Sequence, residues 1–329
     1  MMSMNALLDI KNLSVQFDTD EGRILAVNNI SLSLNAGEVL GIVGESGSGK
    51  SVTAKSIMQL NPDNTHYDGT GEIIIDNENV LRFTSKEDLK KIRGGKVSMI
   101  FQEPMASFAP AIKIGKQMVE QLLLHKSINK EEAKSISIDM LKRVGIADAD
   151  KRFNQYAFEL SGGMRQRAMI AMALSTMPKL LLADEPTTAL DVTIQAQVLN
   201  LIKSIVKEYK MGVVFITHDL GVIAQTADYV AVMYLGCIVE SGPVREIIKN
   251  PKHPYTIGLL EALPDVNNLD VPLKPVPGNI PSPLERPSGC VFHTRCNLYE
   301  EGKCNIELPE LKNYSVNHQV ACLKVNNNE

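Results

Sequence analysis

The chain has 329 residues, with 34 basic and 38 acidic side chains and a formal net charge of −4. This length suits one large domain with a smaller one, or two domains, and the slightly acidic balance argues against a nucleic-acid partner. No apolar run has the length of a membrane span, and the first residues do not resemble a signal peptide. We therefore expect a cytosolic protein whose link to any membrane runs through partners.

Two alternating segments open the chain. Residues 8–17 alternate apolar and polar side chains, and residues 26–34 alternate again after a turn at Gly22, so antiparallel strands are predicted. Phe17 ends the first of these segments. An aromatic ring at this position could stack on a nucleotide base, but the residues alone favour a half-buried strand side chain.

The next segment matches the phosphate-binding motif G-x-x-x-x-G-K-[ST]. An apolar run, 39–43, precedes it and helix-forming residues follow from 51 to 60, which gives the strand–loop–helix context that the motif requires. We expect Lys50 to reach the β- and γ-phosphates of a nucleoside triphosphate and the Ser51 hydroxyl to hold Mg²⁺. The predicted loop consists of Gly44, Glu45, Ser46, Gly47, Ser48, Gly49, Lys50 and Ser51.

The middle of the chain changes from strands to helices. Residues 71–76 and 96–101 read as strands, whereas apolar residues recur at helical spacing from 112 to 145. Ser161 is a good N-cap for a helix over 164–175, and Gly162 and Gly163 would expose backbone N–H groups at its first turn. These glycines indicate either a second anion-binding helix terminus or an ordinary glycine-rich helix start.

A second strand motif carries the acidic residues that ATP chemistry needs. The apolar run 180–183 ends in Asp184 and Glu185. Asp184 is expected to complete the Mg²⁺ shell beside Ser51, and Glu185 to polarise an attacking water. The buried run 213–217 closes on His218, where we expect a γ-phosphate contact. Residues 229–234 and 238–242 read as a closing hairpin.

The last part of the chain differs in composition. Nine of the 16 prolines lie between 251 and 287, so we predict no regular structure there. Four of the five cysteines follow with the spacing C-x₅-C-x₇-C-x₁₇-C. A cytosolic tail with little hydrophobic core is more readily stabilised by a bound metal than by disulfides. The residues alone are compatible with zinc or with an iron–sulfur cluster, and the loose spacing favours the cluster. The predicted ligands are Cys290, Cys296, Cys304 and Cys322.

The order of these motifs over residues 7–250 resembles the nucleotide-binding subunit of ABC transporters. One chain holds one phosphate loop and one signature, so ATP is predicted to lie between two chains, each of which contributes one of them. Further roles follow from the resemblance: the aromatic A-loop at Phe17, the Q-loop and an Mg²⁺ ligand at Gln102, the signature at Ser161–Gly163, the D-loop from Thr188 to Asp191, and the switch histidine at His218.

A closer resemblance within this family is to the D-type ATPase of dipeptide and oligopeptide importers. It is carried by residues 160–167, 253–256, 277–283 and 290–296. It implies a second, F-type ATPase, two membrane permeases, an extracytoplasmic peptide-binding protein and a place on the cytoplasmic face of the membrane. It also implies that the cysteine cluster holds [4Fe–4S] and that ATP and Mg²⁺ are the other cofactors.

The predicted fold is α/β: a P-loop ABC ATPase core with an antiparallel β subdomain, a helical subdomain and an irregular, metal-binding C-terminal extension. The core covers 1–250, with the helical subdomain at about 103–175, and the extension covers 251–329. Alternatives are an importer ATPase for another solute such as nickel chelates, an ABC ATPase working on DNA or the ribosome, and a P-loop kinase or GTPase. The last two are disfavoured because a long coiled coil, a second cassette and an N-K-x-D motif are missing from the sequence.

Overall fold

The computed structural model describes residues 6–187, 190–263 and 274–325. The chain forms two compact units, each assembled from segments that are far apart in the sequence. The first contains residues 1–8, 34–38 and 75–215, and the second contains residues 9–33, 39–74 and 216–329.

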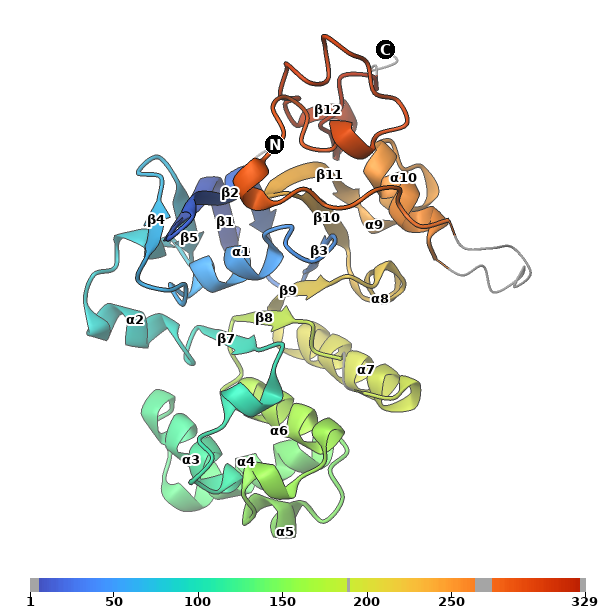
Figure 1. Ribbon diagram of the computed structural model, residues 1–329. Coiled ribbons are helices and arrows are strands. Elements are labelled where there is room, and N and C mark those ends of the chain that lie inside the picture. Colours follow the sequence, from blue (N-terminus) through green and yellow to red (C-terminus); the bar gives the residue numbers. More distant parts are fainter. Residues whose placement is uncertain (1–5, 188–189, 264–273, 326–329) are drawn as a thin grey trace. The chain divides into compact units, whose positions relative to one another are not determined.

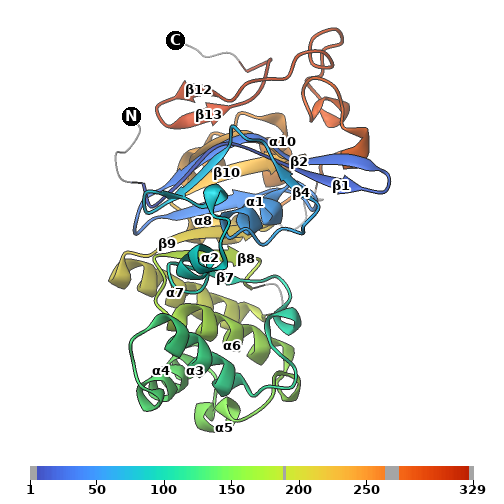
Figure 2. The same ribbon diagram turned by 90° about the vertical axis from the view of Figure 1, so that its left-hand side faces the viewer.

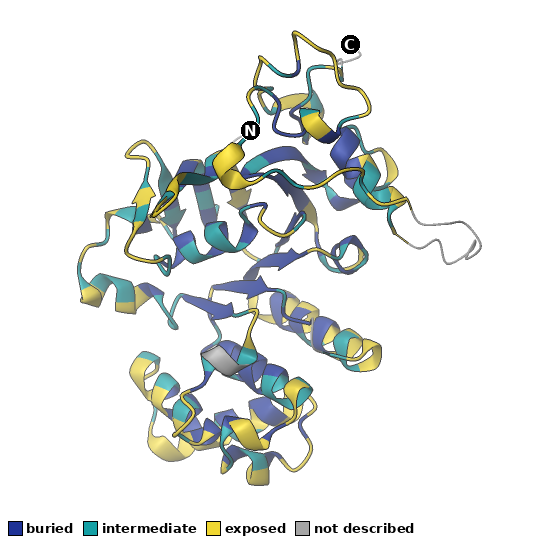
Figure 3. Ribbon diagram, in the orientation of Figure 1, coloured by how far each residue is buried: buried dark blue, intermediate teal, exposed yellow. Residues whose placement is uncertain are grey.

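The first unit combines buried strands with a group of helices (Figure 1). Its β7 and β8 pair in parallel, from Val97 opposite Leu180 to Ile100 opposite Ala183. Every residue of both strands is buried (Figure 3), which explains why most of their residues are apolar rather than alternating with polar ones. In chain order, the elements of this unit are β6 (Glu78–Asn79), η1 (Val80–Arg82), α2 (Lys86–Ile92), β7 (Val97–Ile100), η2 (Pro104–Ser107), α3 (Ile114–His125), α4 (Lys130–Arg143), α5 (Ala149–Phe153), η3 (Ala157–Glu159), α6 (Gly162–Ser175), β8 (Leu180–Asp184), α7 (Val192–Tyr209) and β9 (Gly212–Thr217), which runs across the boundary between the units.

Helices α3 to α6 pack against one another in this unit, as both ribbon views show (Figures 1 and 2). The predicted helical insertion is therefore confirmed. Local signals start these helices: Asn129 and Glu132 form a capping box at α4, and the Ser161 side chain caps α6. In the part of the chain that the structure describes, no helix is both long and apolar enough to cross a membrane.

The second unit contains parts of two sheets. Its part of the first sheet has the strand order β2-β1-β5, with β4 antiparallel to β1, and its part of the second has the order β12-β13-β11-β10-β3, in which the β3–β10 pair is parallel. The predicted opening strands and closing hairpin are both confirmed. In chain order, the elements of this unit are β1 (Leu8–Thr19), β2 (Gly22–Leu34), β3 (Val39–Val43), α1 (Lys50–Ile57), β4 (Thr65–Tyr67), β5 (Glu72–Ile75), α8 (Leu220–Thr226), β10 (Tyr229–Tyr234), β11 (Cys237–Pro243), α9 (Val244–Lys249), α10 (Pro254–Glu261), η4 (Pro283–Glu285), η5 (His293–Arg295), β12 (Lys312–Ser315) and β13 (His318–Val320).

The proline-rich segment contains a helix, so the prediction of no regular structure from 251 to 287 is wrong over α10. Pro254 occupies the first helical position, where a missing N–H leaves no hydrogen bond unmade. The His253 side chain caps the same turn by accepting a hydrogen bond from the Tyr255 N–H at 3.1 Å. A count of prolines over the whole segment therefore overlooked that one of them favours a helix start.

A buried carboxylate in β11 binds both the start of α10 and the strand β13. Glu240, fully buried in β11, accepts hydrogen bonds from the Lys252 N–H at 2.7 Å and the His253 N–H at 3.0 Å. Its other contact is with His318 Nε2 at 2.8 Å, in the strand β13 that pairs with β11. One side chain thus joins the start of α10 and the final hairpin to the same strand.

Candidate nucleotide-binding site

The phosphate loop joins β3 to α1 in the second unit. Gly44 and Gly49 have φ values of 154° and 99°, a region that side chains disfavour. A Cβ atom at Gly44 would collide with the Met233 carbonyl oxygen, and one at Gly49 would lie 2.6 Å from the Ala26 carbonyl oxygen. Glycine is therefore required at both positions, and the curled backbone ends at the N-terminus of α1, a favourable place for an anion.

Lys50, the first residue of α1, lies folded over this loop. Its ammonium group donates hydrogen bonds to the carbonyl oxygens of Gly44 and Glu45, at 2.7 and 2.8 Å, and to Ser48 Oγ at 3.2 Å. Ser51 follows in the same turn and is partly buried. A glycine-built loop with a lysine over it and a hydroxyl at its end fits a polyphosphate with Mg²⁺.

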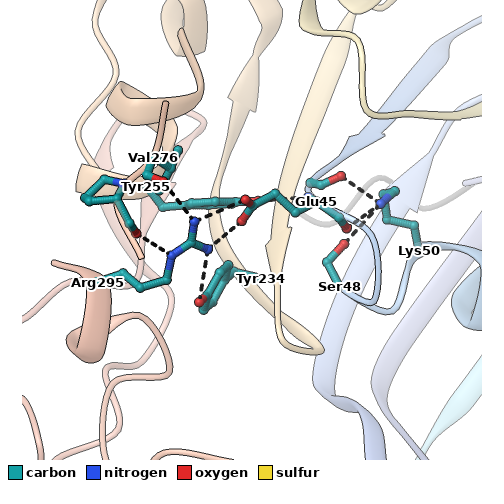
Figure 4. A network of polar contacts seen from close by, with 9 residues as sticks. Glu45, Ser48, Lys50, Tyr234, Tyr255, Val276 and Arg295 are labelled. Carbon is teal, nitrogen blue, oxygen red and sulfur yellow. Dashed lines mark hydrogen bonds and ion pairs between the residues drawn. The ribbon is translucent and has the colours of Figure 1, made fainter. Parts of the chain in front are cut away.

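Glu45, the second residue of the loop, is held by residues from the C-terminal part of the same unit (Figure 4). Its backbone N–H donates to Tyr255 Oη at 2.9 Å. Its carboxylate accepts two hydrogen bonds from Arg295, at 2.7 Å from Nη1 and 3.2 Å from Nη2. Burial alone would lower the pKa of Arg295, but hydrogen bonds to Glu45 and Tyr234 outweigh it and raise that pKa. The sequence motif leaves this position open, so these contacts could not be predicted.

The acidic pair lies in the first unit, at the end of β8. Asp184 is the last residue of that strand and is buried, and Glu185 follows with a φ of 48°, a conformation rare for residues other than glycine. Gln102, which comes shortly after β7, donates from Nε2 to Glu185 Oε2 at 3.3 Å. The structure therefore brings the predicted Q-loop residue and the predicted catalytic glutamate together. Gln166, to which the sequence analysis gave no role, supports the loop after β8 by donating to the Pro186 carbonyl oxygen at 2.6 Å.

The predicted signature residues form the start of α6 in the first unit. Ser161 Oγ accepts a hydrogen bond from the Met164 N–H at 3.3 Å, as expected for an N-cap. Ser161 and Gly162 are exposed, and Gly163 is partly exposed. The first turn of a 14-residue helix is thus accessible to a ligand or to another chain.

The remaining predicted residues lie at the ends of elements. Phe17 is partly buried in β1, opposite Thr65 of β4, and His218 is exposed directly after β9. Asp191 caps α7 by accepting from the Ile194 N–H at 3.0 Å. The first two residues of the predicted D-loop, Thr188 and Ala189, lie outside the described residues.

The four cysteines of the tail are free thiols. Cys290 and Cys304 are buried, and the Cys290 N–H donates to the Cys304 carbonyl oxygen at 2.8 Å. Burial, together with the charges of the other three thiols, raises the pKa of Cys290 to about 11. Within the described residues, however, no group of three or more His, Cys, Asp or Glu side chains is arranged to hold a metal ion. The predicted metal-binding character of the extension is therefore not confirmed.

Family models match both parts of the chain: the ABC transporter model matches residues 27–188, and the model of the oligopeptide/dipeptide transporter C-terminal region matches residues 239–304. The oligopeptide transport ATP-binding protein OppD of Haemophilus influenzae is 47% identical over 95% of both chains. The dipeptide transport ATP-binding protein DppD of Lactococcus lactis is 48% identical over 89% of this chain and 84% of its own length.

Solved structures agree with this similarity. A dimeric ATP-binding cassette in a post-hydrolysis state, bound to ADP and Pi, matches with a TM-score of 0.66 and 28% identity, covering 72% of this chain and 99% of that chain. The cbiO1 protein of Clostridium perfringens, part of an ABC transporter complex, matches with a TM-score of 0.62 and 25% identity, covering 75% of this chain and 92% of that chain.

The fold, the phosphate loop and these relatives define the class: the chain belongs to the family of ATP-binding proteins of ABC transporters. It is therefore an ATPase. Relatives that match it over most of their length include ATP-binding proteins of oligopeptide and dipeptide transport.

Proposed function

We propose that this ATPase drives the import of di- and oligopeptides through a membrane. The observation that carries this proposal is the similarity of the tail: residues 239–304 match the C-terminal region of oligopeptide and dipeptide transporters. Relatives named for oligopeptide and dipeptide transport also align over most of their length. The phosphate loop and acidic strand would serve any ABC ATPase, so the tail is the part that favours peptides over nickel chelates or another solute.

The residue roles within the ATP site form part of the proposal. Lys50 binds the β- and γ-phosphates, and the loop N–H groups surround them. Mg²⁺, when bound, neutralises phosphate charge and would be held by Ser51, Asp184 and Gln102. Glu185 accepts a proton from the attacking water. The hydrogen bond from Gln102 helps to orient the Glu185 carboxylate for this role. His218 contacts the γ-phosphate.

Two chains are needed to complete a site in this proposal. The exposed first turn of α6, with Ser161, Gly162 and Gly163, binds the γ-phosphate held by a partner ATPase, and Asp191 lies in the D-loop facing that partner. Phe17 stacks on the adenine base. ATP then stabilises a closed pair of chains, and hydrolysis removes the phosphate that both chains contact, so the ligand biases a two-state clamp.

The partners and domain limits follow from the same proposal. The second ATPase is of the F type, two permeases form the membrane path, and an extracytoplasmic peptide-binding protein delivers the peptide. The chain lies on the cytoplasmic face of the membrane, without contact to nucleic acid. The ATPase domain covers residues 1–250, including the helical part at about 103–175, and the extension covers residues 251–329.

We also propose that the cysteine tail takes up a [4Fe–4S] cluster, with zinc as the alternative. The four cysteines of the tail are free thiols, and the Leu298 N–H donates to Cys296 Sγ at 3.4 Å, a contact that would support a thiolate. The role would be structural or regulatory, since ATP hydrolysis needs no electron. Anaerobically purified protein should contain about four iron and four sulfide per chain. Colourless protein with one zinc would replace the cluster by the alternative, and metal-free protein with an intact tail would reject both.

Uptake by cells tests the transport proposal. Cells that lack this chain should lose uptake of a radiolabelled dipeptide or tetrapeptide, and the wild-type chain should restore it while Lys50→Ala should not. Uptake of ⁶³Ni-chelate and labelled peptide should be measured in the same cells. Loss of nickel uptake alone would favour the alternative solute, and unchanged uptake of both would overturn the importer assignment.

A further inference from the structure

A single guanidinium group connects the tail to the phosphate loop. Arg295 lies at the end of η5, and its side chain is 3% exposed. It meets the carboxylate of Glu45, which lies 250 positions earlier in the sequence, through two hydrogen bonds. Figure 4 shows the Glu45 side chain pointing toward Arg295 and away from Lys50. Both residues belong to the second unit.

The contacts of Arg295 use all its N–H groups. Besides Glu45, its Nε donates to the Pro277 carbonyl oxygen at 2.8 Å, Nη2 to the Val276 carbonyl oxygen at 3.3 Å and Nη1 to Tyr234 Oη at 3.4 Å. The five N–H donors of the planar guanidinium thus find five acceptor atoms, two of them on Glu45. An ion pair with a buried guanidinium is stable when the remaining N–H donors are satisfied in this way, and a lysine could not make the same set of hydrogen bonds.

The same network fixes the backbone of the loop. Glu45 is held at three points: its N–H by Tyr255 Oη, its carbonyl oxygen by Lys50 Nζ and its carboxylate by Arg295. Two of these three partners come from the C-terminal part of the chain. Tyr255 is fully buried, and its ring lies against those of Tyr234 and Phe292, so the hydroxyl that accepts from the loop is itself firmly placed.

We propose that Arg295 is a positioning residue for nucleotide binding: it holds Glu45, and through it the phosphate loop, in the conformation that accepts ATP. The inference rests on the proposed role of the loop. Arg295 acts in two ways. It limits the loop to one conformation, and it neutralises a carboxylate that would otherwise add negative charge next to a polyphosphate. A tail that ATP chemistry does not itself require thereby supports the ATP site.

Affinity measurements on the full chain test this role. Arg295→Met should raise the dissociation constant for Mg-ATP by about tenfold or more, as expected if the competent loop conformation falls to about a tenth of the population. The dissociation constant of Arg295→Lys should lie between those of wild type and Arg295→Met, because lysine keeps the positive charge but cannot make the paired hydrogen bonds of the guanidinium. The matched control is Arg286→Met, which removes a guanidinium that contacts Leu25 O and Cys237 Sγ rather than the loop, and it should bind ATP like wild type.

A second variant separates charge from folding. Glu45→Gln combined with Arg295→Met should recover part of the lost affinity, because the unpaired carboxylate is removed together with its partner. A merely structural pair predicts no such recovery, so an equally weak double variant would overturn the electrostatic role. If Arg295→Met does not fold, Tyr255→Phe provides the test, since it removes only the hydroxyl that accepts the Glu45 N–H, and it should weaken ATP binding as well.

The outcomes distinguish this inference from the proposed function. Wild-type protein that does not bind ATP would refute the nucleotide site itself. Wild-type binding with equal affinity in folded Arg295→Met would leave the site intact and overturn the positioning role. Equal weakening in Arg295→Met and Arg286→Met would also overturn it, since the effect would then report general damage to the tail.

Discussion

The stability of the C-terminal part of the protein should depend on pH through His253. This side chain caps α10 with an unprotonated Nδ1 that accepts the Tyr255 N–H, and complete burial lowers its pKa from 6.5 to about 3. Below pH 6.5, His253 therefore becomes protonated in the unfolded chain but stays neutral in the folded chain until the pH approaches 3. The stabilisation is present above that pH and is lost progressively as the pH falls toward 3. Between pH 7 and pH 5 the loss amounts to about 2 kcal/mol from this residue.

His253→Asn is the matched variant for this prediction. The Asn side-chain oxygen can accept the same backbone N–H and cap the helix, but it does not titrate. Urea unfolding, followed by circular dichroism at pH 7 and pH 5, should show a fall in unfolding free energy that is about 2 kcal/mol smaller in the variant than in wild type. A difference in overall stability between variant and wild type does not affect this test, because the test compares how much each protein's unfolding free energy changes between pH 7 and pH 5. An equal pH dependence in both proteins, or a folded-state His253 that titrates near its ordinary pKa by NMR, would refute the reasoning.

Three further predictions concern the site and its support. Glu185→Gln should bind ATP but lower turnover in the assembled complex about 10²-fold or more, since a general base is lost; near-normal ATPase activity would contradict its role. Ser161→Ala should leave ATP binding to the isolated chain unchanged and reduce hydrolysis in the complex, whereas weaker binding by the isolated chain would mean that the signature serves its own nucleotide. Glu240→Ala leaves the Lys252 and His253 N–H groups and buried His318 without their acceptor, so we expect about 3 kcal/mol or more of destabilisation in urea unfolding; a change below about 0.5 kcal/mol would contradict that account.

The sequence by itself determined the features that depend on neighbours along the chain. The glycines of the phosphate loop, the apolar run ending at Asp184 and the N-cap at Ser161 each sit in a local pattern, and the structure confirms the strands and helices around them. Hydrophobic periodicity also predicted the helical insertion and the closing hairpin, because period and turn chemistry are properties of short segments.

Tertiary structure decided the features that join distant segments. Gln102 meets Glu185 and Arg295 meets Glu45 across 83 and 250 positions, and a motif that leaves its inner residues open gives no signal for such pairs. Composition also misled the reading of 251–287, because proline disrupts a helix interior yet favours its first position, as Pro254 does in α10. Such contacts cannot be predicted from local sequence because a buried side chain such as Arg295 is held by its neighbours in the folded chain. Those neighbours include residues that are far away in the sequence.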